Sequence, residues 1–221
     1  MGAICHSEEK RDDHNVPLST EPEPLVEIPF NQMDINDFLA NLAKAESLGS
    51  CRKPTGCVTL EAMAACFPEW PSLGNQKNGL SKFLLQRALR GDYHEGEIDV
   101  ICLKLMAIIH CQGTNMGKAK ELYLIFQPED PHILMDISSD DKDIVPSFSK
   151  LCELVLLDCP DAVRPSKSVI NTLLEDKLLA PTFGFNDKVK ANVWLNAAAK
   201  HCSWLFNPDT FRHEISEAIA Q

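Results

Sequence analysis

The sequence predicts a mainly α-helical protein in which short β pieces lie between helices. Apolar residues recur at helical spacing along most of the chain after Asp34. Residues with strand propensity are confined to short segments before helices. The chain of 221 residues is 44% hydrophobic, which is enough to bury a core. No apolar run approaches the roughly 18 to 20 residues that a membrane-spanning helix requires.

The helices are expected in order along the chain. Asp34 is a suitable N-cap for the first of them, and Pro68 and the turn-rich residues 71–79 end the second. The expected helices span residues 35–42, 60–67, 80–89, 100–110, 118–126, 146–157, 168–179, 190–205 and 208–220.

The chain divides into a tail and two helical units. Residues 1–32 are polar, acidic and proline-bearing, which predicts a flexible N-terminal tail. The helical text then divides into residues 33–112 and residues 113–221, with the last expected helix in the second unit.

One β-branched residue precedes a helix at four places. Val58, Ile98, Ile144 and Val189 are separated by 40, 46 and 45 residues. A period near 45 is also compatible with a helical solenoid, but the repeat signatures of such arrays are not visible.

The stretch from Gly96 to Asp99, the helix after it and the Lys-containing helix 118–126 resemble an EF-hand protein. The resemblance is to the four-hand group that includes neuronal calcium sensors and calcineurin B-like subunits, and it covers about residues 34–206. It implies two pairs of EF-hand-like helix-loop-helix units with short paired β pieces between the loops. Val58 would then pair with Ile98, and Ile144 with Val189.

Calcium requires about six to eight oxygen ligands, with a bidentate Glu at the last loop position. That position falls on Ala62, Cys102 and Val193 in the first, second and fourth loops, and Lys53 occupies a ligand position in the first. We therefore expect these loops not to bind calcium, and we expect no other cofactor.

The third loop is the one candidate metal site. Asp136, Ser138 and Asp140 have the spacing of the first three calcium ligands, but Ser147 would then fall at the closing position. A charged, solvated loop is the alternative interpretation.

The first residues suggest a lipid anchor. Met1 to Ser7 partly match the myristoylation pattern at Gly2, with His6 at the position that prefers Ser or Thr. Cys5 would permit a second, palmitoyl chain, since one myristoyl group holds only marginally.

The EF-hand resemblance also implies an apolar groove that binds an amphipathic helix of a protein partner. The expected lining residues are Met106, Ile109, Phe126, Leu154, Leu157, Trp194 and Leu205. Ordinary core packing is the alternative, and the stripe of Phe211, Ile215 and Ile219 would allow the last helix to fill the groove itself.

The composition excludes several functions. A formal net charge of −11 disfavours nucleic-acid binding. The chain contains no phosphate-binding loop, dinucleotide fingerprint or nucleophile elbow, so we expect no enzyme activity.

The leading hypothesis is a calcium-insensitive cytoplasmic adaptor that binds a partner helix at a membrane or in a cytoskeletal or ciliary assembly. The alternatives are a weakly calcium-responsive regulatory subunit of a phosphatase, kinase or channel, and an accessory all-α domain of an enzyme complex.

Overall fold

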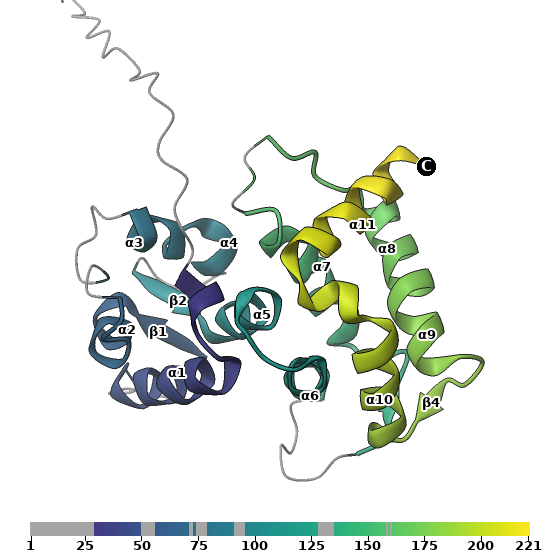
Figure 1. The fold of residues 1–221 in the computed structure, drawn as a ribbon, viewed down its shortest axis with the longest axis horizontal. Helices are drawn as coiled ribbons and strands as arrows, with labels where there is room; N and C mark the ends of the chain where they lie inside the picture. Colours follow the sequence, from purple (N-terminus) through teal and green to yellow (C-terminus); the bar gives the residue numbers. More distant parts are fainter. Residues whose placement is uncertain are drawn as a thin grey trace, which may run out of the picture.

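The computed structural model describes residues 29–49, 56–70, 73, 79–90, 96–127, 135–157, 159 and 161–221 (Figure 1). The first half contains the 3₁₀ helix η1 (Pro29–Gln32), helix α1 (Ile35–Gly49), strand β1 (Cys57–Thr59) and helix α2 (Leu60–Cys66). Helices α3 (Gly79–Leu84) and α4 (Arg87–Arg90), strand β2 (Glu97–Asp99) and helix α5 (Val100–His110) follow.

The second half begins with helix α6 (Asn115–Phe126), strand β3 (Ile137–Ser138) and helix α7 (Ile144–Leu154). Helix α8 (Lys167–Leu173) continues through a π-helical segment, η2 (Leu174–Leu179), into α9 (Ala180–Phe183). Strand β4 (Lys188–Val189), helix α10 (Ala191–His201), the 3₁₀ helix η3 (Ser203–Phe206) and helix α11 (Pro208–Ala220) complete the chain. The predicted mainly helical class is confirmed.

Two short antiparallel strand pairs connect the helices. In the first pair β1 and β2 place Val58 opposite Ile98, as the sequence predicts. In the second pair β3 and β4 place Ile137 opposite Val189, so the prediction that Ile144 occupies this position is wrong. Ile144 is instead the buried first residue of α7, where Pro146 lies in the first turn and its missing N–H leaves no hydrogen bond unmade.

Residues 29–32, which the sequence analysis assigns to the flexible tail, form η1. The Phe30 side chain is completely buried, with its ring centroid 5.2 Å from those of Phe38 and Trp70. The backbone N–H of Ile35 donates to the Gln112 carbonyl at 2.9 Å, and the Gln112 N–H donates to the Met33 carbonyl at 2.9 Å. These bonds attach the start of the described chain to the segment between α5 and α6.

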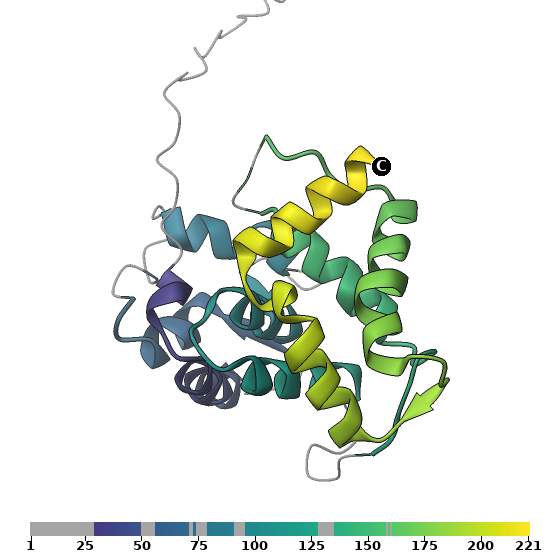
Figure 2. The same cartoon turned by 45° about the vertical axis from the view of Figure 1, so that its right-hand side comes forward.

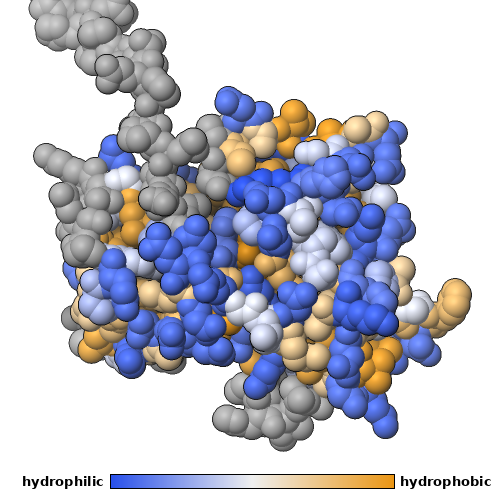
Figure 3. Space-filling view, in the orientation of Figure 1, coloured by the Kyte–Doolittle hydropathy of each residue, from blue (hydrophilic) through white to orange (hydrophobic). Residues whose placement is uncertain are grey.

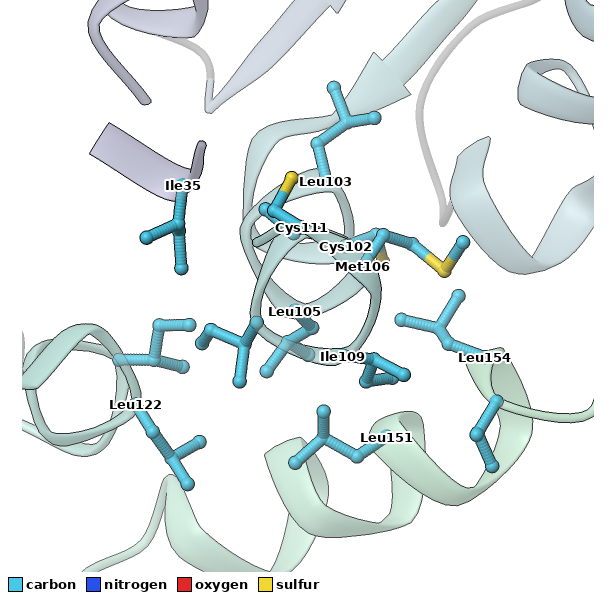
Figure 4. Close-up of a cluster of buried hydrophobic side chains, with 14 of the residues drawn as sticks. Ile35, Cys102, Leu103, Leu105, Met106, Ile109, Cys111, Leu122, Leu151 and Leu154 are labelled. Carbon is cyan, nitrogen blue, oxygen red and sulfur yellow. The ribbon is translucent and has the colours of Figure 1, made fainter. Parts of the chain in front are cut away.

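Helix α5 is buried on nearly every side. Eight of its eleven residues are buried, and it contacts α1, α4, α6, α7, η1 and η3. Figure 4 shows Leu105 and Ile109 of α5 pointing toward Leu122 of α6 and Leu151 of α7. One buried cluster therefore includes residues from both of the units that the sequence analysis separates at residue 112.

The Asp99 side chain determines where α5 begins. Its Oδ1 atom accepts hydrogen bonds from the backbone N–H groups of Ile101 at 2.6 Å and Cys102 at 3.1 Å. Thr59 caps α2 in the same way, accepting from the Ala62 N–H at 3.2 Å. Each cap satisfies N–H groups that have no partner within the helix.

Replacing Leu105 by Ala should destabilise both halves of the protein together. The substitution leaves a cavity beside the most central helix, and such cavities cost about 2 to 5 kcal/mol in the free energy of unfolding. Urea unfolding followed by far-UV circular dichroism should show one transition at a lower midpoint. Ile101→Ala, on the same helix but 51% exposed, is the matched control and should shift the midpoint little; two separated transitions in the Leu105 variant would contradict a shared core.

Candidate functional site

The candidate site lies at the junctions between the strand pairs and the helices after them. Gly56 and Gly96, with φ of +66° and +89°, each lie two residues before the central residue of their strand. Backbone of this kind favours glycine because it has no Cβ. The Val100 N–H donates to the Gly56 carbonyl at 2.9 Å, so the two junctions are bonded to each other across the strand pair.

The residues at the expected closing positions of the first two loops supply no carboxylate to this site. Ala62 is 8% exposed and Cys102 is 2% exposed. Burial, followed by the nearby Asp99 carboxylate, raises the pKa of the Cys102 thiol to about 12, so the thiol is neutral at physiological pH. The expected ligand positions at Lys53 and in residues 91–95 lie outside the described residues, as do Gly2 and Cys5.

In the third loop, hydrogen bonds within the protein occupy oxygen atoms that a cation would need. Ser138 Oγ donates to Asp140 Oδ1 and, at 3.0 Å, to the Asp187 carbonyl. Asp141 Oδ2 accepts from the Ser138 N–H at 2.9 Å and from Gln127 Nε2. Asp136 and Asp140 are exposed.

In the part of the chain that the structure describes, no three His, Cys, Asp or Glu side chains come together in a group that could hold a metal ion. The candidate calcium site of Asp136, Ser138 and Asp140 includes a serine, so it stays a prediction. Val193, at the expected closing position of the fourth loop, is half exposed and provides no oxygen from its side chain.

The residues predicted to line a partner groove are core residues in this conformation. Six of them are buried, and the seventh is partly buried against the same core; the seven are Met106, Ile109, Phe126, Leu154, Trp194, Leu205 and, partly buried, Leu157. Their burial agrees with the alternative of ordinary core packing, and a role in binding a partner stays a prediction. They are buried because α5, α7 and α10 pack against other helices of the same chain.

Helix α11 covers the apolar side of the second half. Figures 1 and 2 show it running beside α8, and its Phe211 and Ile215 side chains are buried. The Phe211 ring centroid lies 5.2 Å from that of Trp204 and 6.4 Å from that of Phe148. The last helix therefore packs against α8, η3 and Phe148, and whether it fills a groove for a partner helix stays a prediction.

Two polar contacts fix α11 in this position. Arg212 Nε donates to the Val155 carbonyl at 2.8 Å, and Lys177 Nζ lies 3.0 Å from Glu214 Oε2. The ion pair is partly exposed, so it contributes little to stability.

Lys118 is a buried charged residue that sequence reasoning missed. Its Nζ donates to the Phe206 carbonyl at 2.8 Å, which connects α6 to the residue two positions before α11. Burial lowers the pKa of Lys118, because removal from water disfavours the ammonium form. In sequence this lysine is identical to any exposed helical lysine, so no local signal identifies it.

Among the described residues no helix is both long and apolar enough to cross a bilayer. Figure 3 shows hydrophobic residues scattered among hydrophilic ones on the face that it displays. Comparison of the chain with protein-family models, curated proteins and solved structures found no match.

The buried thiols should make the protein less stable at alkaline pH. Burial raises the pKa of Cys102, Cys111, Cys152 and Cys202 from 9.0 to about 12. Between these values the unfolded chain releases thiol protons that the folded chain keeps, so the free energy of unfolding falls as pH rises above about 9. The lowered pKa of Lys118 makes the free energy of unfolding rise with pH instead, but it is one group and the buried thiols are four.

Urea unfolding at several pH values between about 8 and 11 measures this dependence. Cys152→Ala should make the decline shallower by up to about 1.4 kcal/mol per pH unit. Leu151→Ala removes a buried side chain from the same helix without removing a titratable group, so it should lower stability and leave the slope unchanged. An unchanged slope in the Cys152 variant would show that this thiol does not contribute.

Proposed function

We propose that this chain is a non-catalytic adaptor built on a degenerate EF-hand-like scaffold that does not respond to calcium. The observation that carries the proposal is the first strand pair. Each strand of the pair has a positive-φ glycine two residues before its central residue, Val58 or Ile98, and these two central residues lie opposite each other. In each strand a helix begins two residues after the central residue. The closing residues, Ala62 and Cys102, provide no carboxylate.

The second strand pair supports the same scaffold with a changed third loop. The pairing of Ile137 with Val189 provides the second connection, and α10 begins two residues after Val189. After Ile137 a polar turn intervenes, so helix α7 begins only at Ile144. Serine donors and carboxylate acceptors satisfy one another in this turn, and that pairing favours a structural role over calcium binding.

The partner that fits this scaffold is a protein with an amphipathic helix. Helix α11 supplies the chemical pattern, since it buries Phe211 and Ile215 one turn apart and places Arg212 on a backbone carbonyl. A partner helix with two large apolar residues at this spacing would replace α11. Acylation at Gly2 and Cys5 would place such an adaptor at a membrane, and a cytoskeletal or ciliary assembly is the other setting we propose.

Calcium titration tests the first half of this proposal. We expect no saturable change in the amide resonances of residues 135–147 in heteronuclear NMR spectra at micromolar calcium, because the loop oxygens already accept hydrogen bonds. If resonances in this segment shift with saturation, and Asp136→Asn with Asp140→Asn abolishes the shift, the protein is instead a calcium-responsive regulatory subunit.

Loosening α11 tests the second half. Phe211→Ala combined with Ile215→Ala removes its buried side chains, so a labelled peptide of residues 207–221 should bind this variant about tenfold or more tightly than the wild-type protein. Fluorescence anisotropy measures the affinity, and circular dichroism verifies folding. Ser216→Ala, on the exposed side of α11, is the control; equal binding by the double variant and the control would exclude a helix-accepting groove here.

A further inference from the structure

An open groove of about 480 Å³ lies along one side of helix α1. Its walls come from η1, from α1 and from the segment after α2, and Figure 1 shows α1 and α2 side by side. The apolar part of its lining consists of Pro29, Met33, Ala40 and Trp70. The volume is within the range of about 300 to 1,000 Å³ typical of ligand sites, so a short segment of another protein fits in it.

The residues of α1 that line the groove share one face of the helix. Ala40 and Asn41 are three and four residues after Asp37, and Lys44 is three residues after Asn41. Residues at this spacing are neighbours on the helix surface. Asp34 lies directly before α1 and also lines the groove. Two carboxylates are therefore at one end of this face, and the ammonium of Lys44 is at the other.

The charged residues of the groove are available to a partner. Glu69, from the segment after α2, supplies a third carboxylate. Asp34, Asp37, Glu69 and Lys44 are all exposed, and within the described part of the chain none of them forms an ion pair. Lys44 Nζ lies 3.5 Å from Asn41 Oδ1, which is a weak contact. With three carboxylates and one ammonium the lining is net negative, so it attracts a basic group.

We propose that the groove binds an extended segment of another protein, in which a basic residue, an apolar residue and an acidic residue occupy alternate positions. Alternate side chains of an extended chain lie on one face, and four residues span about 13 Å. At 1.5 Å per residue, Lys44 is about 10 Å along α1 from Asp37 and about 15 Å from Asp34. The basic residue would meet the carboxylates, the apolar residue Met33 and Trp70, and the acidic residue Lys44.

A helical segment is less suitable for this groove. A helix is about 10 Å across, and two turns of it fill roughly 800 Å³, which exceeds the volume of the groove. An extended chain crosses the same distance with fewer residues, since it rises about 3.3 Å per residue. The occupant therefore differs from the amphipathic helix proposed above as a partner.

The chain itself does not supply the segment. None of its 21 Lys and Arg residues has an apolar residue two positions away and an acidic residue four positions away in the same direction along the chain. In residues 1–28, Lys10 and Arg11 have Asp12 and Asp13 two positions later, which the carboxylates of the groove would repel. The occupant is therefore another protein. This surface is separate from the one that α11 covers, so the adaptor function proposed above neither requires nor excludes it.

Heteronuclear NMR of the full chain, titrated with short peptides, tests the proposal. The peptide acetyl-Arg-Ser-Leu-Ser-Glu-amide should cause saturable shifts in the amide resonances of residues 32–44 and 69–70, and added salt should weaken the binding because the charges are exposed. Acetyl-Arg-Ser-Leu-Ser-Arg-amide should bind about threefold or more weakly, because its second arginine meets Lys44. Acetyl-Arg-Ser-Ser-Ser-Glu-amide, which has no apolar residue, should also bind more weakly.

Variants of the protein assign the charges. Asp37→Asn combined with Glu69→Gln should raise the dissociation constant of the first peptide about tenfold, because two carboxylates that attract its arginine are removed. Glu175→Gln, at an exposed carboxylate outside the groove, is the matched control and should leave it unchanged. Lys44→Glu should reverse the preference, so that the peptide with two arginines binds more tightly than the peptide that ends in Glu. Circular dichroism verifies that each variant is folded.

Three results would overturn the proposal. The first is the absence of saturable shifts in residues 32–44 with the first peptide. The second is binding of the peptide with two arginines to the wild-type protein as tightly as the first peptide or more tightly, which would show only general attraction to a chain of net charge −11. The third is equal weakening by Glu175→Gln and by the groove variant.

Discussion

The enclosure of helix α5 is the constraint on which the rest of the structure depends. A helix that is apolar on nearly every side is stable in water only when other elements cover it. Helices α1, α4, α6 and α7 and the short helices η1 and η3 provide that cover. As a consequence α5 presents little surface to any partner, and the segments before and after Gln112 belong to one core.

The first strand pair could be predicted from sequence because its determinants are local. A glycine, a β-branched residue two positions later and a capping residue directly before a helix occur together at Gly96, Ile98 and Asp99. The second pair depends on contacts between residues distant in sequence. Ser138 and Ser139 bond to Asp187, and this bonding rather than any local spacing selects Ile137 over Ile144.

The sequence alone could not decide whether the candidate groove residues are buried within the chain or contact a partner, for a related reason. An apolar stripe on a helix is the same in sequence whether its partner is another protein or a later part of the chain. Only the structure shows that Phe211 and Ile215 are buried within the chain, with the Phe211 ring against those of Phe148 and Trp204. Phe30 is a similar case. A single aromatic residue in a proline-bearing segment has no periodic pattern around it, so the sequence cannot distinguish a tail residue from a core residue.

The third and fourth loops show how a loop can be fixed without an ion. In the proposed EF-hand-like scaffold a calcium ion would attract carbonyl and carboxylate oxygens toward one point. Here N–H and hydroxyl donors from Ser138, Ser139 and Gln127 attract the Asp187 carbonyl and the Asp141 carboxylate instead. Because these donors are permanent parts of the chain, the contacts between the two loops do not require an ion. In the adaptor that we propose, the surfaces that these loops support would then be available for binding without an ion-dependent change of shape.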